Sequence, residues 1–485
     1  MNLYNSNNLT LLTDLYELTM IQGYFFYKRN LNVVFDMFFR YQPFNGGYSV
    51  FAGLEPLIKT ILSFKFTDDD IAYLEKLKLF KPSFLKYLSN FKFNGDIYSV
   101  EEGEVVFPKE PLIRVHGNII EAQIIESILL NIINFQTLIA TKTARIVESA
   151  KGKAIIEFGL RRAQGVDGAI SASRASFIGG AIATSNVLAG KLFDIPVKGT
   201  MAHSWVMAFN SELESFKKYA KLYPENTILL IDTYDTLKKG IPSAIKVLKE
   251  LKKLGIKNFG IRLDSGDLEY LSKQARIMLD KAGLKEAKIV ASNELNEHII
   301  EQLVNKKAPI DFFGVGTNLV TAQDSPSFPG VYKLVAKKTK NEYVPSIKVS
   351  NNPEKTTNPH IKNILRVYNE KNLMLGDLIF LEKEKESIYK TLKNMEPLTF
   401  YHPEYNYEWI KIKKYKNHRI LLKNIVKNGK LNYEFPDIKK IQQKTKSNLN
   451  SLHPSYKRLL NPHIYKVSLT EKLMKLKINL IKKYR

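Results

Sequence analysis

Between residues 150 and 335 the chain alternates short, β-rich apolar runs with longer amphipathic stretches. The apolar runs cover residues 153–159, 195–201, 227–232, 258–264, 288–293 and 311–316. Stretches of helical length, such as 236–255 and 267–283, lie between most of them. Strands that alternate with helices in this way predict a parallel sheet built from βα units. So many units in one region favour an α/β fold with a (β/α) barrel-like domain, and an open sheet is the alternative.

The segments on either side of this region have other patterns, with turns rich in glycine and proline. Before it we expect a capped helix at 11–26, a strand, a glycine-rich turn and a second apolar segment at 33–54, hairpin-like strands at 96–117 and a long helix at 119–150. After it we expect strands at 342–350 and 362–369 and an amphipathic helix at 468–484.

Composition excludes several classes of site. The chain has no cysteine, so it has no disulfide, no thiolate nucleophile and no cysteine-ligated zinc or iron–sulfur centre. Its 8 histidines show no HExxH or other ligand spacing, and we expect no protein-held transition metal. The opening MNLYNSNNLT is polar and predicts no signal peptide. Because uncharged runs such as Ala175–Gly190 are too short to span a bilayer, we expect a cytoplasmic protein without a membrane partner.

The net charge of +25 is concentrated in the C-terminal third. Residues 336–485 hold 33 Lys and Arg against 13 Asp and Glu. Such a region can bind nucleic acid through phosphates. It is rich in Lys, Asn and Ile but poor in Arg, and it lacks the RNP-type aromatic signature and any zinc-finger spacing. We therefore favour a solvated basic surface and expect no nucleic-acid partner.

Polar residues close each predicted strand of the central region. They are Glu157, Thr200 with His203, Asp232, Asp264, Asn293 and Gly316 with Thr317. Each alone is explained as a helix N-cap, and His203 alone as a core histidine. Because barrel active sites are assembled at the carboxyl ends of the strands, their coincidence predicts the rim of a site.

The same residues suit phosphate chemistry. The segment FFGVGTNLVTA exposes the backbone of Gly314, Gly316 and Thr317 at a strand end, which favours an anion site, although glycine there is also a common turn residue. No Walker motif occurs. Asp232 and Asp264, with Asp267, are suited to hold Mg²⁺ through a substrate phosphate. Arg262 and Asp264 share one face of their strand, which places both charges on one wall.

Several long motifs resemble the nicotinate phosphoribosyltransferase family. They are LLTDLYELTM, FDMFFRYQPFNGGYSVFAGL, the segment from Glu157 to Phe209, IRLDSGDL, FFGVGTNLVTAQDSP, GVYKLV and NPEKTTNP. They occur in order from residue 9 to about residue 370, and the resemblance continues more weakly to NPHIYKVSLTEKL. Two positions depart from the family, Ala183 and His360, where glycine is usual or common.

The resemblance implies a barrel-like α/β domain, an α+β N-terminal domain completed partly by C-terminal segments, and homodimers with shared active sites. We accordingly divide the chain into an N-terminal domain (1–125), a catalytic domain (126–335) and a basic C-terminal region (336–485) that packs on both. The implied reaction joins nicotinate and 5-phosphoribosyl 1-diphosphate into nicotinate mononucleotide and diphosphate. It is coupled to ATP hydrolysis through a phosphohistidine, with Mg²⁺ as cofactor.

The resemblance also implies residue roles. The phosphorylated histidine is His203, held between Gly199-Thr200 and Ser204. By the same resemblance, Tyr16 of the neighbouring subunit and Phe158 sandwich the pyridine ring, and Arg262 and Thr200 bind the nicotinate end. Arg161 and Arg40 serve the base and phosphate regions. Asp232 and Asp264 flank ribose and Mg²⁺, and Gly316 and Thr317 cradle the 5-phosphate. We add Asn293 to the substrate-binding set from its place at a strand end. For Phe158, an apolar packing role is the alternative.

Two other functions stay open at this point. Nicotinamide phosphoribosyltransferases share the fold, and they carry an Asp where this chain has Ser185. A hydroxyl tolerates the nicotinate carboxylate, whereas a buried carboxylate repels it, so Ser185 favours the acid as substrate. The other alternative is a nucleic-acid-binding protein that uses the basic C-terminal third.

Overall fold

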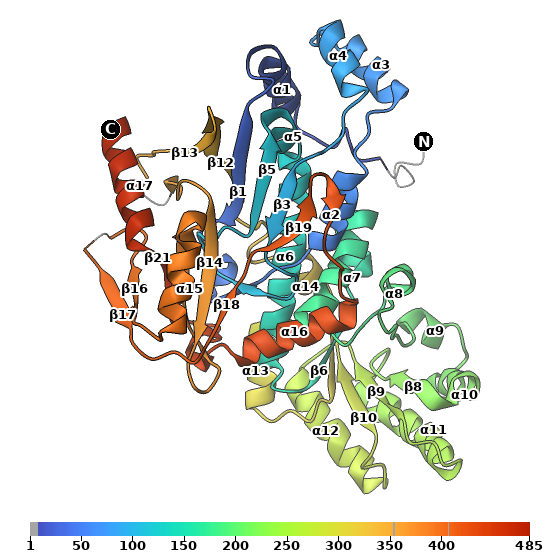
Figure 1. Cartoon of the computed structure of the whole chain (residues 1–485). Helices are drawn as coiled ribbons and strands as arrows, with labels where there is room; N and C mark the ends of the chain where they lie inside the picture. Colours follow the sequence, from blue (N-terminus) through green and yellow to red (C-terminus); the bar gives the residue numbers. More distant parts are fainter. Residues whose placement is uncertain (1–7, 353–354, 406) are drawn as a thin grey trace. The chain divides into compact units, whose positions relative to one another are not determined.

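The computed structural model describes residues 8–352, 355–405 and 407–485. The chain forms two compact units (Figure 1). The first comprises the chain up to Leu138 together with Ser327–Arg485, and the second comprises Ile139–Pro326. The three-domain division made from the sequence stays a prediction. The polar opening residues 1–7, on which the absence of a signal peptide was predicted, lie outside the described residues.

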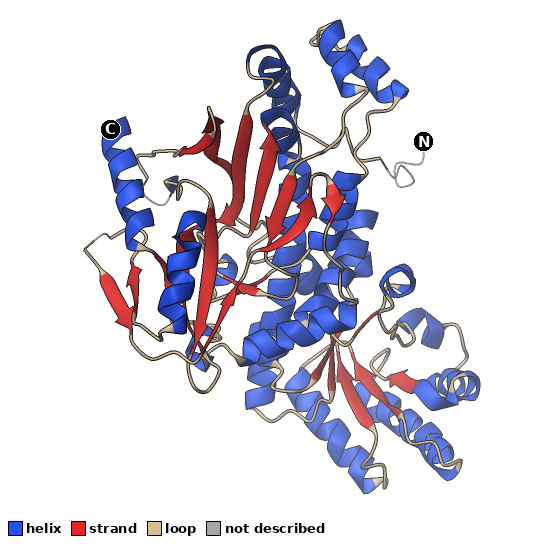
Figure 2. Ribbon diagram, viewed as in Figure 1, coloured by secondary structure: helices blue, strands red, loops and turns tan. Residues whose placement is uncertain are grey.

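The second unit is built on a parallel six-stranded sheet, seen among its helices in Figure 2. Its strands are β6 (Ala154–Glu157), β7 (Ala183–Thr184), β8 (Thr227–Leu230), β9 (Phe259–Leu263), β10 (Lys288–Ala291) and β11 (Phe312–Val315). The order across the sheet is β7-β6-β11-β10-β9-β8, and every pair of neighbours is parallel. The sheet has two end strands, β7 and β8, so it does not close into a full barrel and is a half-barrel instead. The predicted βα architecture is confirmed.

Helices lie between these strands or directly after the last of them. They are α7 (Val166–Gly179), α8 (Val187–Phe193), α9 (His203–Met207), α10 (Glu212–Leu222), α11 (Ile241–Lys253), α12 (Leu268–Lys281), α13 (Glu297–Asn305) and α14 (Thr317–Thr321). The helices predicted within 236–255 and 267–283 are confirmed as α11 and α12. The N-cap chemistry is also present, since the side chain of Asp267 accepts a hydrogen bond from the backbone N–H of Tyr270 at 3.0 Å.

The strand predicted at 195–201 is wrong. Val197 makes a single isolated bridge to Thr184, and the rest of that segment is irregular. The neighbouring strand β7 is two residues long and ends the sheet, so it offers too little backbone to pair a full strand. The segment therefore reaches His203 as an irregular connection to α9.

The first unit contains two larger sheets, of which the seven-stranded one mixes N-terminal and C-terminal strands and the six-stranded one consists of C-terminal strands. The order of the seven-stranded sheet is β13-β12-β1-β5-β3-β19-β20, and the order of the six-stranded sheet is β17-β16-β21-β15-β14-β18. The strands of the first are β1 (Asn32–Phe39), β3 (Asp96–Ser99), β5 (Ile113–Asn118), β12 (Gly330–Thr339), β13 (Glu342–Pro345), β19 (Lys423–Lys427) and β20 (Lys430–Leu431). Those of the second are β14 (Lys362–Tyr368), β15 (Met374–Leu381), β16 (Leu398–Tyr401), β17 (Trp409–Ile412), β18 (Asn417–Ile420) and β21 (Val467–Leu469). Completion of the N-terminal part by C-terminal strands is thus confirmed.

The helices of this unit include the predicted terminal ones. They are α1 (Leu15–Tyr27), α2 (Leu54–Leu62), α3 (Asp68–Lys76), α4 (Pro82–Leu88), α5 (Ile119–Ile124), α15 (Lys385–Lys393), α16 (Ile438–Asn450) and α17 (Glu471–Tyr484), and a short pair, β2 (Ser49–Val50) with β4 (Val105–Val106), completes the unit. Helix α6 (Glu126–Ser149) follows α5. The segment Ile119–Ser149 is long and apolar enough to cross a membrane, which differs from the expectation based on uncharged runs. However, 67% of its most apolar window is buried inside the protein, as in the core helix of a folded domain.

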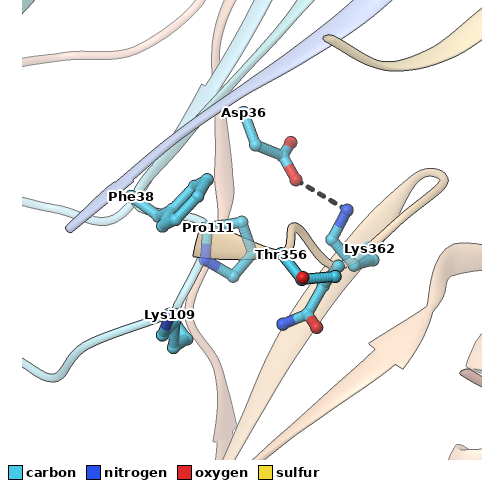
Figure 3. A pocket seen from close by; sticks show the side chains of 7 residues that line it. Asp36, Phe38, Lys109, Pro111, Thr356 and Lys362 are labelled. Carbon is cyan, nitrogen blue, oxygen red and sulfur yellow. Dashed lines mark ion pairs between the residues drawn. The ribbon is translucent and has the colours of Figure 1, made fainter. Parts of the chain in front are cut away.

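Buried ion pairs join the two sheets of the first unit. Lys362 of β14 lies 2.7 Å from the carboxylate of Asp36 on β1, and both side chains are 2% exposed (Figure 3). Arg366, fully buried on the same strand, pairs with Asp377 at 2.5 Å and Glu104 at 2.8 Å. The contacts of Lys362 with Asp36 and of Arg366 with Glu104 join residues more than 200 positions apart in the chain, which explains why local patterns did not predict them.

The motif NPEKTTNP lies beside the Asp36–Lys362 pair. Thr356 and Asn358 line a cavity of about 10 Å³ with this pair, which is room for about one water molecule (Figure 3). Pro353 and Glu354 of the motif lie outside the described residues. His360, which departs from the family pattern, has φ 70°, a left-handed conformation that glycine adopts more easily.

Candidate functional site

The carboxyl ends of the parallel strands bring four predicted residues together in the second unit. Arg262 lies on β9 and Asp264 directly follows that strand, so the guanidinium reaches the carboxylate at 2.7 Å. His203 opens α9, and its Nε2 lies 3.7 Å from Oδ2 of Asp264. Thr200 contributes a hydroxyl 3.1 Å from Nη1 of Arg262. The strand ends thus form one polar cluster, as predicted for a rim.

Three different side chains fix the guanidinium of Arg262. Its Nε donates to Ser292 at 2.8 Å, Nη1 donates to Thr200 at 3.1 Å and Nη2 donates to Asp264 at 2.7 Å. Its carbon also lies 5.6 Å from the centre of the Phe158 ring. A guanidinium has five N–H groups, and these contacts use three of them. One N–H on each terminal nitrogen is left, which is the arrangement that binds a carboxylate in a bidentate manner.

Asp264 is kept ionised by its neighbours. Burial alone raises its pKa, but the charge of Arg262, hydrogen bonds from Ser292 and Arg262, and the nearby His203 together hold the pKa below its usual value of 3.8. The hydroxyl of Ser292 accepts from Arg262 and donates to Asp264, so it bridges the two charges. The cluster therefore presents a permanent carboxylate beside a permanent cation.

Asp232 follows β8 and turns toward the loop after β9. Its Oδ2 accepts hydrogen bonds from the backbone N–H of Asp264 at 2.7 Å and from the hydroxyl of Ser265 at 2.8 Å. Its Oδ1 is buried and has no hydrogen-bond partner. An unsatisfied buried carboxylate oxygen is costly unless a ligand pairs with it, so Asp232 is suited to contact a cation or a donor.

His203 is accessible and oriented. Its Nδ1 lies 3.1 Å from the hydroxyl of Thr233, and its side chain is 41% exposed. The alternative explanation, a core histidine, does not fit a side chain with this exposure. Ser204 is exposed on the first turn of the same helix. The imidazole thus faces solvent beside the carboxylate of Asp264.

Phe158 lies on a tightly built corner after β6. Its backbone N–H donates to Val315 at 2.8 Å. The buried carboxylate of Glu157, just before it, accepts hydrogen bonds from the N–H of Gly159 and from the hydroxyls of Ser173 and Thr184. Glu157 therefore fixes the corner rather than facing the cluster.

The loops after β10 and β11 lie next to one another. Thr317 donates its hydroxyl to Glu294 at 3.3 Å, and Gly316 directly precedes α14. Asn293 is exposed with φ 109°, an unusual conformation for a residue with a side chain. It lines an open hollow of about 360 Å³ with Asp267 and Glu294. Asp267 caps α12 through its Oδ1 and lines this hollow.

Four predicted site residues remain, two in each unit. Arg161 is exposed in the turn Leu160–Arg162, and Ser185 donates its backbone N–H to the carbonyl of Glu157 at 2.9 Å. Tyr16 on α1 is 49% exposed, and Arg40 follows β1, with its N–H donated to the Pro329 carbonyl at 3.2 Å. Both belong to the first unit. Their roles stay predictions.

Sequence reasoning missed three hydroxyl residues of the site. Ser292, Thr233 and Ser265 each lie within three residues of a strand end, in the short runs ASN, DTY and DSG. Position at a strand end was the available signal, but one or two residues were chosen at each strand end, and these three neighbouring hydroxyl residues were passed over. Which hydroxyl contacts which charge depends on neighbouring strands and is not visible in the chain order.

Family models and related proteins agree on one family. The N-terminal domain model of nicotinate phosphoribosyltransferase matches residues 11–134, the family model matches 153–386 and the C-terminal domain model matches 361–477. The nicotinate phosphoribosyltransferase of Bacillus subtilis is 44% identical over 475 residues, covering 96% of this chain and 94% of that protein.

Solved structures with the same fold extend this likeness. The human nicotinic acid phosphoribosyltransferase has a TM-score of 0.82 at 27% identity, covering 97% of this chain and 99% of that one. The nicotinate-nucleotide pyrophosphorylase of Pyrococcus furiosus has a TM-score of 0.69 at 21% identity, covering 92% and 97%, and shows the fold alone. On the matched length and identity, this chain belongs to the nicotinate phosphoribosyltransferase family.

Proposed function

We propose that this protein joins nicotinate and 5-phosphoribosyl 1-diphosphate into nicotinate mononucleotide and diphosphate, with ATP as co-substrate. The observation that carries the proposal is the guanidinium of Arg262. It is held by three side chains and keeps one N–H on each terminal nitrogen for a carboxylate. The Phe158 ring lies beside it, so a planar aromatic acid satisfies both groups at once.

The carboxylates serve the ribose in this proposal. As diphosphate leaves, C1 of the ribose gains oxocarbenium character, and fixed negative charge nearby lowers the energy of that state. Asp264 stays ionised because its pKa is lowered by Arg262 and Ser292 against the effect of burial. Asp232 is held beside it by hydrogen bonds from the backbone N–H of Asp264 and from the hydroxyl of Ser265. Gly316, Thr317 and Asn293 then serve the 5-phosphate end.

His203 is the proposed phosphoryl acceptor. A neutral imidazole is nucleophilic at cellular pH, and this one is exposed, with one ring nitrogen placed against Thr233. ATP transfers its γ-phosphoryl group to the ring nitrogen, the P–O bond to ADP breaks, and the imidazole proton passes to solvent. Hydrolysis of the phosphohistidine returns the neutral ring. Ser204, which directly follows His203, and Thr200 flank the transferred group.

Mg²⁺ is the proposed cofactor. The described residues contain no group of three or more His, Asp or Glu side chains arranged to hold a metal ion, so a cage of protein ligands does not fit. Mg²⁺ is usually bound by one or two carboxylates and by substrate phosphates, and the unpaired Oδ1 of Asp232 fits that role. When bound, the ion neutralises the charge of the departing diphosphate.

The site is proposed to be shared in a homodimer. Helix α8 exposes Val187, Leu188 and Leu192 at 71%, 48% and 55%, and exposed apolar helix faces are typical of interfaces. In the shared site, Tyr16 of the neighbouring subunit covers the pyridine ring opposite Phe158. Arg40 and Arg161 serve the base and phosphate regions. We expect the protein in the cytoplasm, with no nucleic-acid partner.

The substrate is the acid rather than the amide. Ser185 stands where the nicotinamide enzymes carry an Asp, and a hydroxyl does not repel the nicotinate carboxylate. We expect kcat/KM to favour nicotinate over nicotinamide by orders of magnitude, and Ser185→Asp to shift the ratio toward the amide. Comparable values for the two bases in the wild-type protein contradict the assignment.

The deciding experiment is an assay of diphosphate release. Purified protein is given nicotinate, 5-phosphoribosyl 1-diphosphate and Mg²⁺, with and without ATP. We expect release that depends on nicotinate and is stimulated by ATP, together with acid-labile, base-stable label from γ-labelled ATP that His203→Ala abolishes. Absence of nicotinate-dependent release refutes the function. Unchanged labelling in His203→Ala refutes the role of the histidine alone.

A further inference from the structure

We infer that Gly314 is a positioning residue for the base-binding ring of Phe158. The inference concerns β11, which contributes no residue to the cluster around Arg262 but runs beside the corner that carries Phe158. It rests on the proposed function, because it assigns a task to the Phe158 ring. Gly314 acts through the absence of a side chain, since it leaves the space in which the ring lies.

Hydrogen bonds at and next to Phe158 hold its backbone in place. Its N–H donates to the Val315 carbonyl at 2.8 Å, one residue after Gly314. Glu157 before it is 1% exposed, and its carboxylate binds the N–H of Gly159 and the hydroxyls of Ser173 and Thr184. The corner is therefore fixed on both sides of Phe158. A change in the space around the ring has to be met by rotation of the ring itself.

The space beneath the ring exists only because residue 314 is glycine. A Cβ built on Gly314 lies 2.4 Å from Cδ2 and 2.5 Å from Cε2 of Phe158. Ordinary van der Waals contact of a Cβ begins at 3.4 Å, so alanine displaces the ring by about 1 Å. The same Cβ meets Ser292 at an ordinary 3.4 Å, so the clash is with the ring alone.

The displaced ring moves with respect to the fixed guanidinium. Arg262 lies 5.6 Å from the ring centre and is held by Ser292, Thr200 and Asp264, so it does not follow the ring. A base that binds the guanidinium through its carboxylate and the ring through its face needs both at one fixed separation. A misplacement of about 1 Å in such a pair costs up to about 100-fold in rate. Gly314 thus sets the geometry of the slot for the pyridine ring.

Gly314→Ala tests the inference, with Gly168→Ala as the matched control. Gly168 lies in α7 of the same unit, and a Cβ there meets nothing within 4 Å. We expect Gly314→Ala to raise KM for nicotinate about 10-fold or more. The KM for 5-phosphoribosyl 1-diphosphate and the ATP-dependent labelling of His203 are expected to stay within about twofold, because neither depends on the position of the Phe158 ring. A merely structural lesion reduces the labelling as well and leaves the KM for nicotinate unchanged. The control is expected to match wild type.

A double-mutant cycle shows whether the effect passes through the ring. In a Phe158→Ala background the clash is absent, so adding Gly314→Ala is expected to leave kcat/KM for nicotinate unchanged. The double variant also keeps the test available if Gly314→Ala alone fails to fold, since removal of the ring is then expected to restore folding. Equal KM values for nicotinate in Gly314→Ala and wild type, or additive losses in the cycle, overturn the inference while the proposed function stands. A wild-type protein that releases no diphosphate with nicotinate overturns both.

Discussion

Replacement of Ser292 by alanine is expected to disable the site without unfolding the protein. The hydroxyl is 2% exposed, accepts from Nε of Arg262 at 2.8 Å and donates to the carboxylate of Asp264. It therefore contributes two hydrogen bonds to charged groups. Alanine removes both and leaves a buried N–H of the guanidinium without a partner. The substitution adds no atoms, so it introduces no steric strain.

The size of the effect follows from these contacts. Hydrogen bonds to charged groups are worth about 1.5–3 kcal/mol each, and two that share one hydroxyl are not additive. We expect a loss of about 2–3 kcal/mol in the transition state, which lowers kcat/KM for nicotinate by about 30- to 150-fold. Thr200 and Asp264 still hold the two terminal nitrogens of Arg262, so the loss is partial.

The pH profile supplies a second readout. Ser292 is one of the groups that lower the pKa of Asp264 against the effect of burial, so its removal raises that pKa. The carboxylate is needed in its ionised form, and activity therefore begins to fall at a higher pH in the variant than in wild type. The acid limb of the kcat/KM profile moves upward, while the alkaline limb stays in place.

Diphosphate release is measured across pH for wild type, Ser292→Ala and the control Ser272→Ala. Ser272 is also a buried serine, but its hydroxyl donates within α12 to the carbonyl of Glu269 at 3.1 Å. The control is expected to keep activity within about twofold. If Ser292→Ala unfolds at the wild-type temperature yet retains kcat/KM within about threefold and the same acid limb, the bridging role is refuted.

Other predictions concern stability and assembly. Lys362→Met leaves the buried carboxylate of Asp36 unpaired and is expected to lower the free energy of unfolding in urea by about 3–5 kcal/mol. The double variant with Asp36→Asn should recover most of this loss. An equal loss in the single and the double variant contradicts the pairing. Burial raises the pKa of Glu17 from 4.5 to about 7, so the folded state binds its proton more tightly and this contribution to stability is lost as pH rises from about 5 through 7. Glu17→Gln should therefore raise Tm at pH 8 more than at pH 5, and a difference independent of pH refutes the reasoning. Tyr16→Ala and His203→Ala homodimers should each be nearly inactive, whereas co-expression restores up to about a quarter of wild-type activity, unless each site is built within one chain.

Local patterns were sufficient for much of the second unit. The strands at 227–232, 258–264, 288–293 and 311–316 and the helices between them depend on apolar periodicity and capping residues, which are properties of short segments. The strand predicted at 195–201 fails for the opposite reason. A strand needs a partner, and its neighbour β7 has two residues. Apolar residues alone do not supply that partner.

The candidate site divides in the same way. The order of residues in the chain shows that charged side chains close the strands. Because parallel strands carry their carboxyl ends to one edge, Arg262, Asp264 and His203 come together. That Ser292 bridges two of these charges and that Phe158 occupies the space left by Gly314 is visible only in the three-dimensional structure. The family resemblance implied that C-terminal segments complete the N-terminal part, but which strands pair there is likewise visible only in the fold. These contacts join residues that are far apart in the chain, and their geometry is set by packing in three dimensions rather than by local conformational preference.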